Sequence, residues 1–187
     1  EQHIAGALEE TYLLERLVED LRLLTLAEAR QLPFDRRPMA LNDLARRVVD
    51  LFCAEAEEKH IALELRLPPE TAIIVADAQR MEQAVGNLVS NALRYLPEGG
   101  WVQVALDVTG SQVEISVSDN GPGVAEADLP RLFERFWRAE SARARNTGGS
   151  GLGLAIAREL VEAQGGSISA RNRPEGGLRV AIVFPIS

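Results

Sequence analysis

The sequence has little of the chemistry that builds disulfides or metal centres. Its 187 residues include one cysteine, Cys53, so an intrachain disulfide is impossible, and two histidines, His3 and His60, which are far apart. A metal site made from Cys and His ligands is therefore excluded. Such low cysteine usage favours a reducing compartment. We place Cys53 on the buried face of a helix and assign it no role.

Long apolar runs and an excess of basic charge are missing as well. No apolar run approaches the roughly 18–20 residues needed to span a bilayer, and no signal peptide is visible. The net charge of −8 argues against non-specific nucleic-acid binding through a basic surface. The chain begins at Glu1, without a methionine and inside a helical pattern, so we expect it to be part of a longer protein.

Two familiar phosphate-binding motifs are also absent. There is no Gly-Lys-Ser or Gly-Lys-Thr, which excludes a P-loop, and the Gly-x-Gly-x-x-Gly pattern counted from Gly149 fails at Leu154. Four glycines nevertheless fall between Gly148 and Gly153 and lead directly into an apolar-periodic segment. A helix that starts there directs unpaired N–H groups and its positive dipole end at a phosphate. The alternative is a flexible surface loop followed by a helix.

The apolar periodicity predicts an α/β protein. We expect a mixed, mostly antiparallel sheet with helices on one face, because strands and helices do not alternate strictly. Helices are predicted at 1–30, from Asn42 as N-cap, at 77–95, at 152–164 and, as a short piece, at 132–137. Strands are predicted at 61–67, 71–76, 101–108, 113–119, 167–172 and 178–184.

The first 40 residues are predicted to stand apart from the rest. Residues 1–30 form a long N-terminal helix with a wide leucine stripe, which a bundle with another copy would cover. Packing of this helix on its own domain is the alternative. Residues 31–39 contain Pro33 and Pro38 around charged residues and read as a linker. We therefore expect one domain at 40–187.

The predicted helix 77–95 carries a narrow polar stripe apart from its apolar face. Asn87, Asn91 and Arg94, spaced by four and three, share one side of this helix. Amide oxygens can bind a hard cation, and amide and guanidinium groups can donate to phosphate. A solvated polar face is the alternative, although asparagine is a poor helix former and such faces favour Glu and Lys.

Two further segments contain side chains that could bind a ligand. Asp119 ends a strand and is followed by Gly121 and Gly123, so its carboxylate selects a donor such as an exocyclic amine; an ordinary turn is the alternative. Arginines then gather locally in this acidic chain, where they suit phosphate contact, unless they form only a basic loop. They are Arg131, Arg135, Arg138, Arg143 and Arg145.

In this order, the motifs resemble those of the catalytic, ATP-binding part of sensor histidine kinases. The wider family includes DNA gyrase and the ninety-kilodalton heat-shock chaperone. One such motif is a weak indication, but the ordered set over residues 40–187 is strong. The matching segments are Asn87-Leu-Val-Ser-Asn91-Ala-Leu-Arg94-Tyr95 (N box), Asp119-Asn-Gly121-Pro-Gly123 (first glycine box), Leu132-Phe-Glu-Arg135-Phe-Trp-Arg138 (F box) and Gly149-Ser-Gly151-Leu-Gly153-Leu154 (second glycine box).

The resemblance implies a two-layer sandwich of the Bergerat type. ATP would lie between the N-box helix and a mobile lid at residues 124–150. Asp119 would accept from the adenine amine, with Tyr95 packed on the base. The resemblance further implies Asn87 as the Mg²⁺ ligand, Asn91 and Arg94 near the phosphates, Arg135 or Arg138 at the γ-phosphate, and ATP contacts at Gly121, Gly123, Gly149, Ser150, Gly151, Leu152, Gly153 and Leu154.

One departure from the wider family carries chemical meaning. Its ATPases place a glutamate at the position of Asn87, where it acts as the general base on water. An amide cannot take that proton, so we expect slow hydrolysis and transfer of the γ-phosphate to another nucleophile.

The nucleophile of the resembling kinases is a histidine followed by an acidic residue and a proline. His3 is followed by Ile4-Ala5-Gly6 and His60 by Ile61-Ala62-Leu63, so neither fits. Residues 1–30 resemble the second helix of the dimerisation hairpin, and we expect its first helix upstream. This chain should bind ATP without phosphorylating itself.

The partners implied are a histidine of its own upstream helix or of a dimer mate, and the aspartate of a response regulator. The resemblance also implies a homodimeric, cytoplasmic portion of a sensor, attached to a membrane only through upstream segments. Two alternatives stay open: an anti-sigma-type serine kinase of the same fold, and a nucleotide-binding regulatory module without transfer. The helix at 1–30 argues against the first, and the intact motifs argue against the second.

Overall fold

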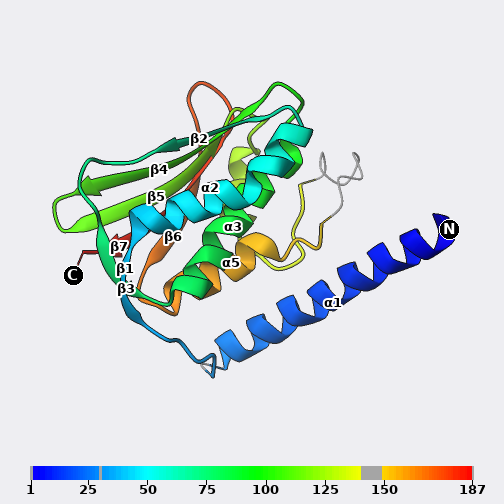
Figure 1. Cartoon of the computed structure of the whole chain (residues 1–187), viewed down its shortest axis with the longest axis horizontal. Helices are drawn as coiled ribbons and strands as arrows, with labels where there is room; N and C mark the ends of the chain where they lie inside the picture. The colour runs from blue at the N-terminus through cyan, green and yellow to red at the C-terminus, as the bar shows by residue number, and fades with distance from the viewer. Residues whose placement is uncertain (1, 30, 140–148, 187) are drawn as a thin grey trace. The chain divides into compact units, whose positions relative to one another are not determined.

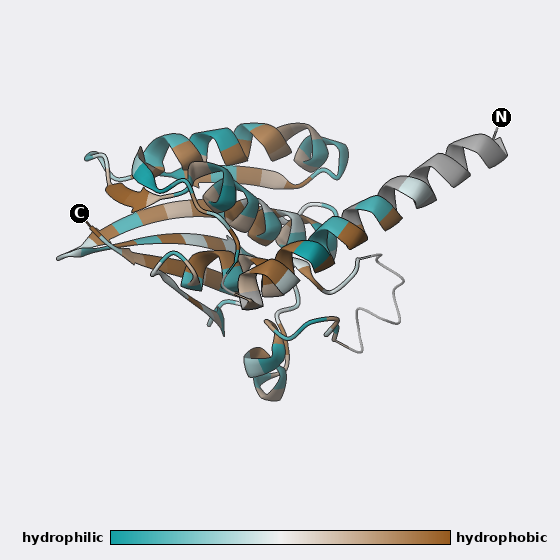
Figure 2. Ribbon diagram, turned by 90° about the horizontal axis from the view of Figure 1, so that it is seen from below, coloured by the Kyte–Doolittle hydropathy of each residue, from teal (hydrophilic) through white to brown (hydrophobic). Residues whose placement is uncertain are grey.

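The computed structural model describes residues 2–29, 31–139 and 149–186. The chain divides into two compact units, residues 1–33 and residues 34–187, which are considered separately here. The first unit contains the helix α1 (Gln2–Glu28), in agreement with the helix predicted at 1–30. Its apolar residues Leu14 and Val18, one turn apart, are 64% and 61% exposed. Hydrophobic and hydrophilic residues alternate along α1 in Figure 2.

The second unit is built on a five-stranded sheet with the order β2-β4-β5-β7-β6. The β2–β4 pair is parallel and the other three pairs are antiparallel. The helices α2, α3 and α5 lie on one face of this sheet (Figure 1), which confirms the predicted fold class. The strands are β2 (Ala62–Arg66), β4 (Trp101–Thr109), β5 (Gln112–Asp119), β6 (Ser167–Asn172) and β7 (Leu178–Pro185); the helices are α2 (Leu41–Glu58), α3 (Ala78–Tyr95) and α5 (Gly153–Glu162).

The core lies between the sheet and the helices. Val113, Ile115 and Val117 of β5 are buried against the helices, as expected for alternate residues on the covered face of a strand. Each buried aliphatic side chain of this size contributes about 1.5–3 kcal/mol. Ser116 and Ser118 of the same strand are buried as well. The helix α3 contributes the apolar face that its periodicity predicts, and all of the members of that face are buried: Met81, Val85, Leu88, Val89 and Ala92.

The predicted linker at 31–39 is partly wrong, because residues 37–40 form a strand. β1 (Arg37–Ala40) pairs antiparallel with β3 (Ile73–Ala76) in a separate two-stranded ribbon. Pro38 lies opposite Val75 in this ribbon, and an edge position of this kind tolerates a residue without an N–H donor. The pairing partner lies over 30 residues away, so local composition could not reveal it.

The prediction that Asn42 caps a helix is wrong as well. The helix α2 begins at Leu41 after Ala40, and Asn42 is buried within its first turn. The Asn42 Oδ1 accepts a hydrogen bond from the Ala72 N–H at 3.1 Å, so this amide ties α2 to the segment before β3. Farther along α2, Cys53 is exposed rather than buried as predicted.

The short helix predicted at 132–137 is also misplaced. The helical turn is a 3₁₀ segment, η1 (Glu126–Arg131), and residues 132–136 form turns and bends. Phe136 has a φ of +59°, which no right-handed helix can include.

Searched over the described residues, the helices contain no stretch with the length and apolar character that a bilayer crossing demands.

Candidate functional site

Two of the predicted motifs meet where α3 lies beside the start of α5. The Asn87 Nδ2 on α3 donates a hydrogen bond to the Gly153 carbonyl at 3.1 Å. Sixty-six residues separate the two partners, so this bond exists only because the sheet brings the helices together. The amide oxygen occupies the other branch of the Asn87 side chain, and such an oxygen is a suitable ligand for a hard cation.

A second contact between the same motifs involves Arg94. Gly149 has a φ of +127°, and a Cβ atom at this position would collide with the Arg94 guanidinium. Any other residue would therefore displace this arginine or distort the turn. The glycine brings the last turn of α3 and the second glycine motif into direct contact.

The arginine-bearing segment is held to the second glycine motif through Phe136. The Phe136 N–H donates to the Gly151 carbonyl at 3.0 Å, and a Cβ atom on Gly151 would lie 2.9 Å from the Phe136 carbonyl carbon. A left-handed backbone is uncommon for a bulky residue, and such conformations cluster at functional sites. The adjacent Arg135 and the nearby Arg138 are half-buried.

The start of α5 presents backbone donors beside these side chains. The Leu152 N–H is 3.3 Å from the Ser150 Oγ, and the helix begins at Gly153. The N–H groups of a first helical turn have no partner inside the helix, and together with the dipole they favour an anion. Leu152 and Leu154 are buried, so their side chains anchor the turn while its backbone remains near Asn87.

Asp119 lies at the end of β5 with 9% of its surface exposed. Burial raises the pKa of its carboxyl above the ordinary value, and this rise is opposed by the N–H groups of Gly121 and Leu178 and by the charge of Arg173. Both N–H groups donate to Oδ1, at 2.8 Å and 3.2 Å. The second oxygen, Oδ2, is the acceptor that this geometry offers to a ligand.

The hairpin between β6 and β7 folds onto Asp119, which sequence reasoning missed. The Arg173 Nη1 donates to the Asp119 carbonyl at 2.9 Å, and Asn172 exchanges hydrogen bonds with the N–H and carbonyl of Val124 at 3.0 Å and 2.7 Å. Gly177, with a φ of +92°, packs directly on the Asp119 backbone. The available signal in the sequence was the polar pair Asn172-Arg173 at the end of a predicted strand. The local sequence does not indicate which distant segment this hairpin contacts.

The other predicted site residues are distributed around this centre. Asn91 and Tyr95 are half-buried on α3, one and two turns beyond Asn87, and Gly121 and Gly123 follow Asp119. Gly148, Arg143 and Arg145 lie outside the described residues. Among the residues the structure describes, no group of three or more His, Cys, Asp and Glu side chains could hold a metal ion.

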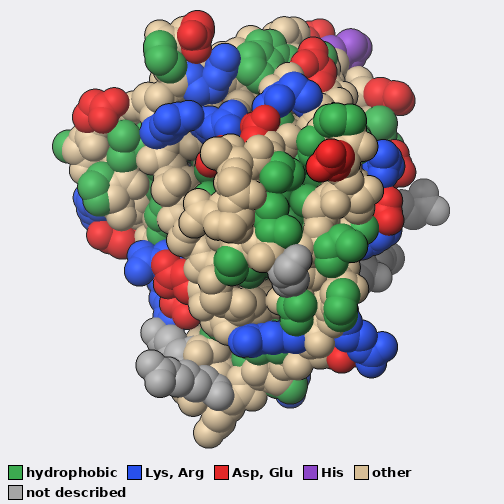
Figure 3. All heavy atoms as spheres, turned by 90° about the vertical axis from the view of Figure 1, so that its left-hand side faces the viewer, with side chains coloured by type: hydrophobic (Ala, Val, Ile, Leu, Met, Phe, Trp, Pro, Cys, Tyr) green, Lys and Arg blue, Asp and Glu red, His purple; other side chains and the backbone are tan. Residues whose placement is uncertain are grey.

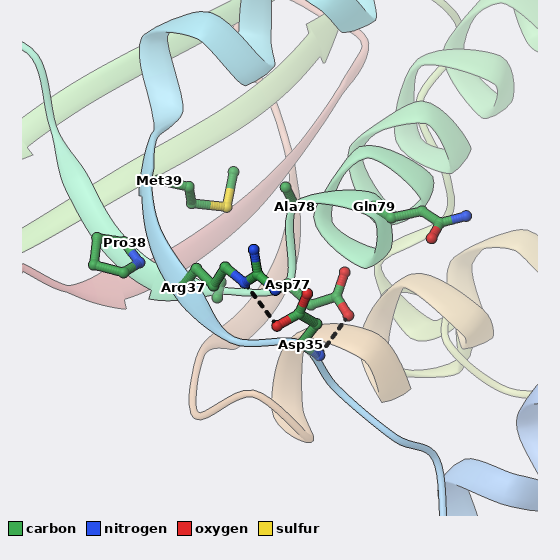
Figure 4. Close-up of a pocket in the computed structure, with 8 residues that line it drawn as sticks. Asp35, Arg37, Pro38, Met39, Asp77, Ala78 and Gln79 are labelled. Carbon is green, nitrogen blue, oxygen red and sulfur yellow. Dashed lines mark hydrogen bonds and ion pairs between the residues drawn. The ribbon is translucent and has the colours of Figure 1, made fainter.

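A pocket of about 420 Å³ lies away from all of these motifs, at the amino end of α3 (Figure 4). Its polar groups already pair with one another: Arg37 Nε is 2.9 Å from Asp35 Oδ1, and the Asp35 N–H donates to Asp77 Oδ2 at 2.9 Å. We assign this pocket to the packing of β1 and β3 against α3. It is lined by Asp35, Arg37, Pro38, Met39, Ala76, Asp77, Ala78 and Gln79.

Charge is mixed on the face of the molecule in Figure 3. Lys and Arg side chains are interspersed there with Asp and Glu side chains. A nucleic-acid-binding surface gathers basic side chains on one face, and this face shows no such gathering.

Comparison with known proteins identifies close relatives. The family model for "Histidine kinase-, DNA gyrase B-, and HSP90-like ATPase" matches residues 76–187. The signal transduction histidine-protein kinase BaeS of Escherichia coli is 34% identical over 183 residues, which are 98% of this chain and 39% of BaeS. The sensor histidine kinase WalK of Bacillus subtilis is 35% identical over 178 residues, 94% of this chain and 29% of WalK. The chain thus spans about two fifths or less of these two relatives.

Solved structures give the same picture. Full-length ShkA in complex with AMPPNP superposes with a TM-score of 0.84 at 29% identity, covering 96% of this chain and 37% of ShkA. The histidine kinase ThkA in complex with the response regulator protein TrrA gives a TM-score of 0.76 at 25% identity, covering 95% of this chain and 49% of ThkA.

Proposed function

Because this chain belongs to the family of histidine kinase-, DNA gyrase B- and HSP90-like ATPases, we propose that it is the ATP-binding catalytic portion of a bacterial two-component sensor histidine kinase. Its activity would be transfer of the ATP γ-phosphate to a histidine, and then to a response-regulator aspartate. The observation that carries the proposal is the junction of Asn87 and Gly153 at 3.1 Å. This junction joins a polar helix face to a helix N-terminus.

The two ends of the site suit the two ends of ATP. A buried carboxylate at Asp119 accepts a hydrogen bond from an exocyclic amine, and the backbone donors at the start of α5 suit phosphate oxygens. Tyr95 is assigned to the base, with Gly121 and Gly123 near it. Arg94, Asn91 and residues 149–154 are assigned to the phosphates, and Arg135 and Arg138 to the γ-phosphate.

Magnesium fits the donor set at Asn87. Mg²⁺ in proteins retains water and takes few protein ligands beside phosphate oxygens, and the Asn87 amide oxygen is a ligand of that kind. When bound, the ion would neutralise charge on the phosphates. An asparagine at this place orients and coordinates but cannot remove a proton from water, which favours transfer over hydrolysis.

The remaining partners follow from the relatives. ThkA is seen with a response regulator, and we propose a response regulator as the final phosphate acceptor here. We propose that α1 is the second helix of a dimerisation and phosphotransfer hairpin, and that the catalytic domain, expected from the sequence at residues 40–187, extends back to residue 34 and so includes β1. The phosphorylated histidine would belong to the upstream helix of the same protein or its dimer mate. The cytoplasm is the proposed compartment.

Nucleotide binding is the first experiment. Saturation with Mg-ATP at about 100 times the dissociation constant should stabilise the chain by about 2.7 kcal/mol, measured as an upward shift of thermal unfolding. Asp119→Asn should lose this shift, and Asp50→Asn, on the exposed side of α2, should retain it. No shift for the unmodified chain would contradict the proposal.

Phosphate transfer is the second experiment. The chain is mixed with labelled ATP and with a separate helical hairpin that carries the phosphoacceptor histidine of the parent protein. We expect label on that histidine. Binding without transfer would favour a nucleotide-binding regulatory module instead, and label on a serine of an added protein would favour an anti-sigma-type serine kinase.

A further inference from the structure

The contacts of Arg173 reach the first glycine motif from outside it. Arg173 follows β6, and its Nη1 donates to the Asp119 carbonyl at 2.9 Å and to the Gly176 carbonyl at 3.1 Å. Its guanidinium carbon lies 4.5 Å from the centre of the Trp101 ring. This stacking fixes the plane of the guanidinium. The arginine therefore holds the strand end from which the Asp119 carboxylate projects.

Arg173 supplies positive charge to the surroundings of the Asp119 carboxylate. Among the described residues, Val102 of β4 lies opposite Asp119 in the register, and the Leu178 N–H of β7 donates to Oδ1. Leu96, after α3, lies beside Gly121 together with the carboxylate. The positive charge of Arg173 opposes the burial that raises the pKa of Asp119.

The carboxylate of Glu175 lies beside the Arg173 guanidinium. Glu175 Oε2 is 3.6 Å from the Arg173 Nη2, and the two side chains are 71% and 19% exposed. Arg173 is thus shielded from solvent, whereas Glu175 is solvated. Removing the Glu175 carboxylate changes the charge beside Arg173 without disturbing a buried group.

We propose that Arg173 is a positioning residue for base recognition, which holds the Asp119 backbone in place and supplies positive charge near its carboxylate, so that the carboxylate can accept a hydrogen bond from the amine of the purine. This inference rests on the proposed function, because it concerns the same nucleotide site. It adds a residue that none of the four motifs contains.

The test is the pH dependence of ATP binding. A protonated Asp119 cannot accept with both oxygens, so affinity falls as the pH falls through the pKa of this carboxyl. Loss of a hydrogen bond to a charged group weakens binding by about 10- to 100-fold in the acid limit. Without the arginine the pKa is higher, so for Arg173→Met the midpoint of the affinity–pH curve is expected at a higher pH than for the wild type.

Three further variants separate charge from architecture. Arg171→Met removes the same charge two residues away on exposed β6 and should leave the midpoint in place. Arg173→Lys keeps the charge but not the fork to two carbonyls, so it should weaken binding at every pH with little change of midpoint. Glu175→Gln leaves Arg173 and the fold intact, and its midpoint is expected at a lower pH.

Asp119→Asn assigns the titration, because its weakened ATP affinity, measured at higher ATP concentrations, should show no such step in any background. Protonation of the nucleotide itself is common to all variants and cancels in the comparison. If Arg173→Met does not fold, Glu175→Gln carries the test of charge and Arg173→Lys carries the test of the two carbonyl contacts. An unshifted midpoint in Glu175→Gln and in a folded Arg173→Met, with ATP bound by the wild type, would overturn this inference alone. Failure of the wild-type chain to bind ATP would overturn the proposed function and the inference with it.

Discussion

Single residues at this site are constrained by direct contact with groups distant in the sequence. Gly177 lies against the Asp119 backbone, and Gly149 lies against the Arg94 guanidinium. Asn87 bonds to a carbonyl sixty-six residues away. These residues therefore respond to substitution in ways that their local sequence does not predict.

Gly177→Ala provides a sharp test of such a constraint, with Gly176→Ala as its matched control. Both glycines have a left-handed φ, +92° and +96°, but a Cβ atom would meet nothing within 4 Å at Gly176. We expect Gly176→Ala to lower the free energy of unfolding by about 1–2 kcal/mol. Gly177→Ala should cost about 1–3 kcal/mol more, because it overpacks a dense site. Denaturant unfolding measures both, and equal losses would contradict the close packing.

Asn87→Ala and Asn87→Asp test the metal role. If the Asn87 oxygen coordinates Mg²⁺, the ion should no longer raise the ATP affinity of Asn87→Ala, and both variants should lose Mg²⁺-dependent transfer to the separate hairpin. Loss of the bond to Gly153 costs only about 1 kcal/mol of stability, so the variants should fold. Gln83→Ala, on the same helix, should keep both properties. Retained Mg²⁺-dependent transfer by Asn87→Ala would disprove the metal role, whereas retention by Asn87→Asp alone would not, because a carboxylate oxygen also binds Mg²⁺.

At the scale of elements, α3 and α5 are joined at two places. Asn87, midway along α3, bonds to Gly153 at the start of α5. The N–H of Asp77, which caps α3, donates to the Gln164 Oε1 at 2.6 Å. The segment before β1 is fixed near Gln164 as well, because the Arg36 Nη2 donates to the Ala163 carbonyl at 2.5 Å. The helix that begins at the second glycine motif is thus held at its far end by the buried Gln164 and by the bond from Arg36 to the Ala163 carbonyl.

Gln164→Ala tests how much the Gln164 side chain contributes to the free energy of unfolding. The side chain is buried, and its Nε2 also donates to the Leu160 carbonyl at 2.8 Å. Its removal leaves the Asp77 N–H unpaired, so we expect a loss of about 1–3 kcal/mol in the free energy of unfolding. For comparison, Glu162→Ala breaks an exposed pair with Arg158 at 3.1 Å and should cost about 0.3–0.5 kcal/mol. Similar losses of unfolding free energy in the two variants would contradict a stabilising role for the buried Gln164.

At the scale of the whole molecule, the chain consists of two units, and the second has a helical layer on one face of a five-stranded sheet. Such a chain presents a nucleotide site but needs a nucleophile. His60 is exposed, with its Nδ1 3.6 Å from Glu98, and His3 lies in a sequence unlike that of the phosphorylated histidine of kinases. Neither supplies the acceptor.

The chain alone should therefore bind ATP without phosphorylating itself. Incubation of residues 1–187 with labelled ATP and Mg²⁺ is expected to give no acid-labile phosphohistidine. The same preparation should label the separate histidine-bearing hairpin, which serves as the positive control. Label on His3 or His60 would contradict the expectation, and substitution of each histidine by glutamine would identify the site.

The sequence by itself determined the family, the helical and strand periods, and the residue types of the four motifs. These features are local, because a helical face or a glycine turn depends on neighbours within a few residues. Even the apolar face of α3, from Met81 to Ala92, follows from spacing alone.

Only the tertiary structure decided which distant segments touch. The sheet order β2-β4-β5-β7-β6 sets the hairpin of Arg173 and Gly177 against Asp119, and pairing with β3 makes a strand of residues expected to be a linker. The tertiary structure also buries Asn42 and leaves Cys53 exposed. Contacts across 30 to 60 residues depend on how strands pair and helices stack, and no periodicity along the chain records that choice.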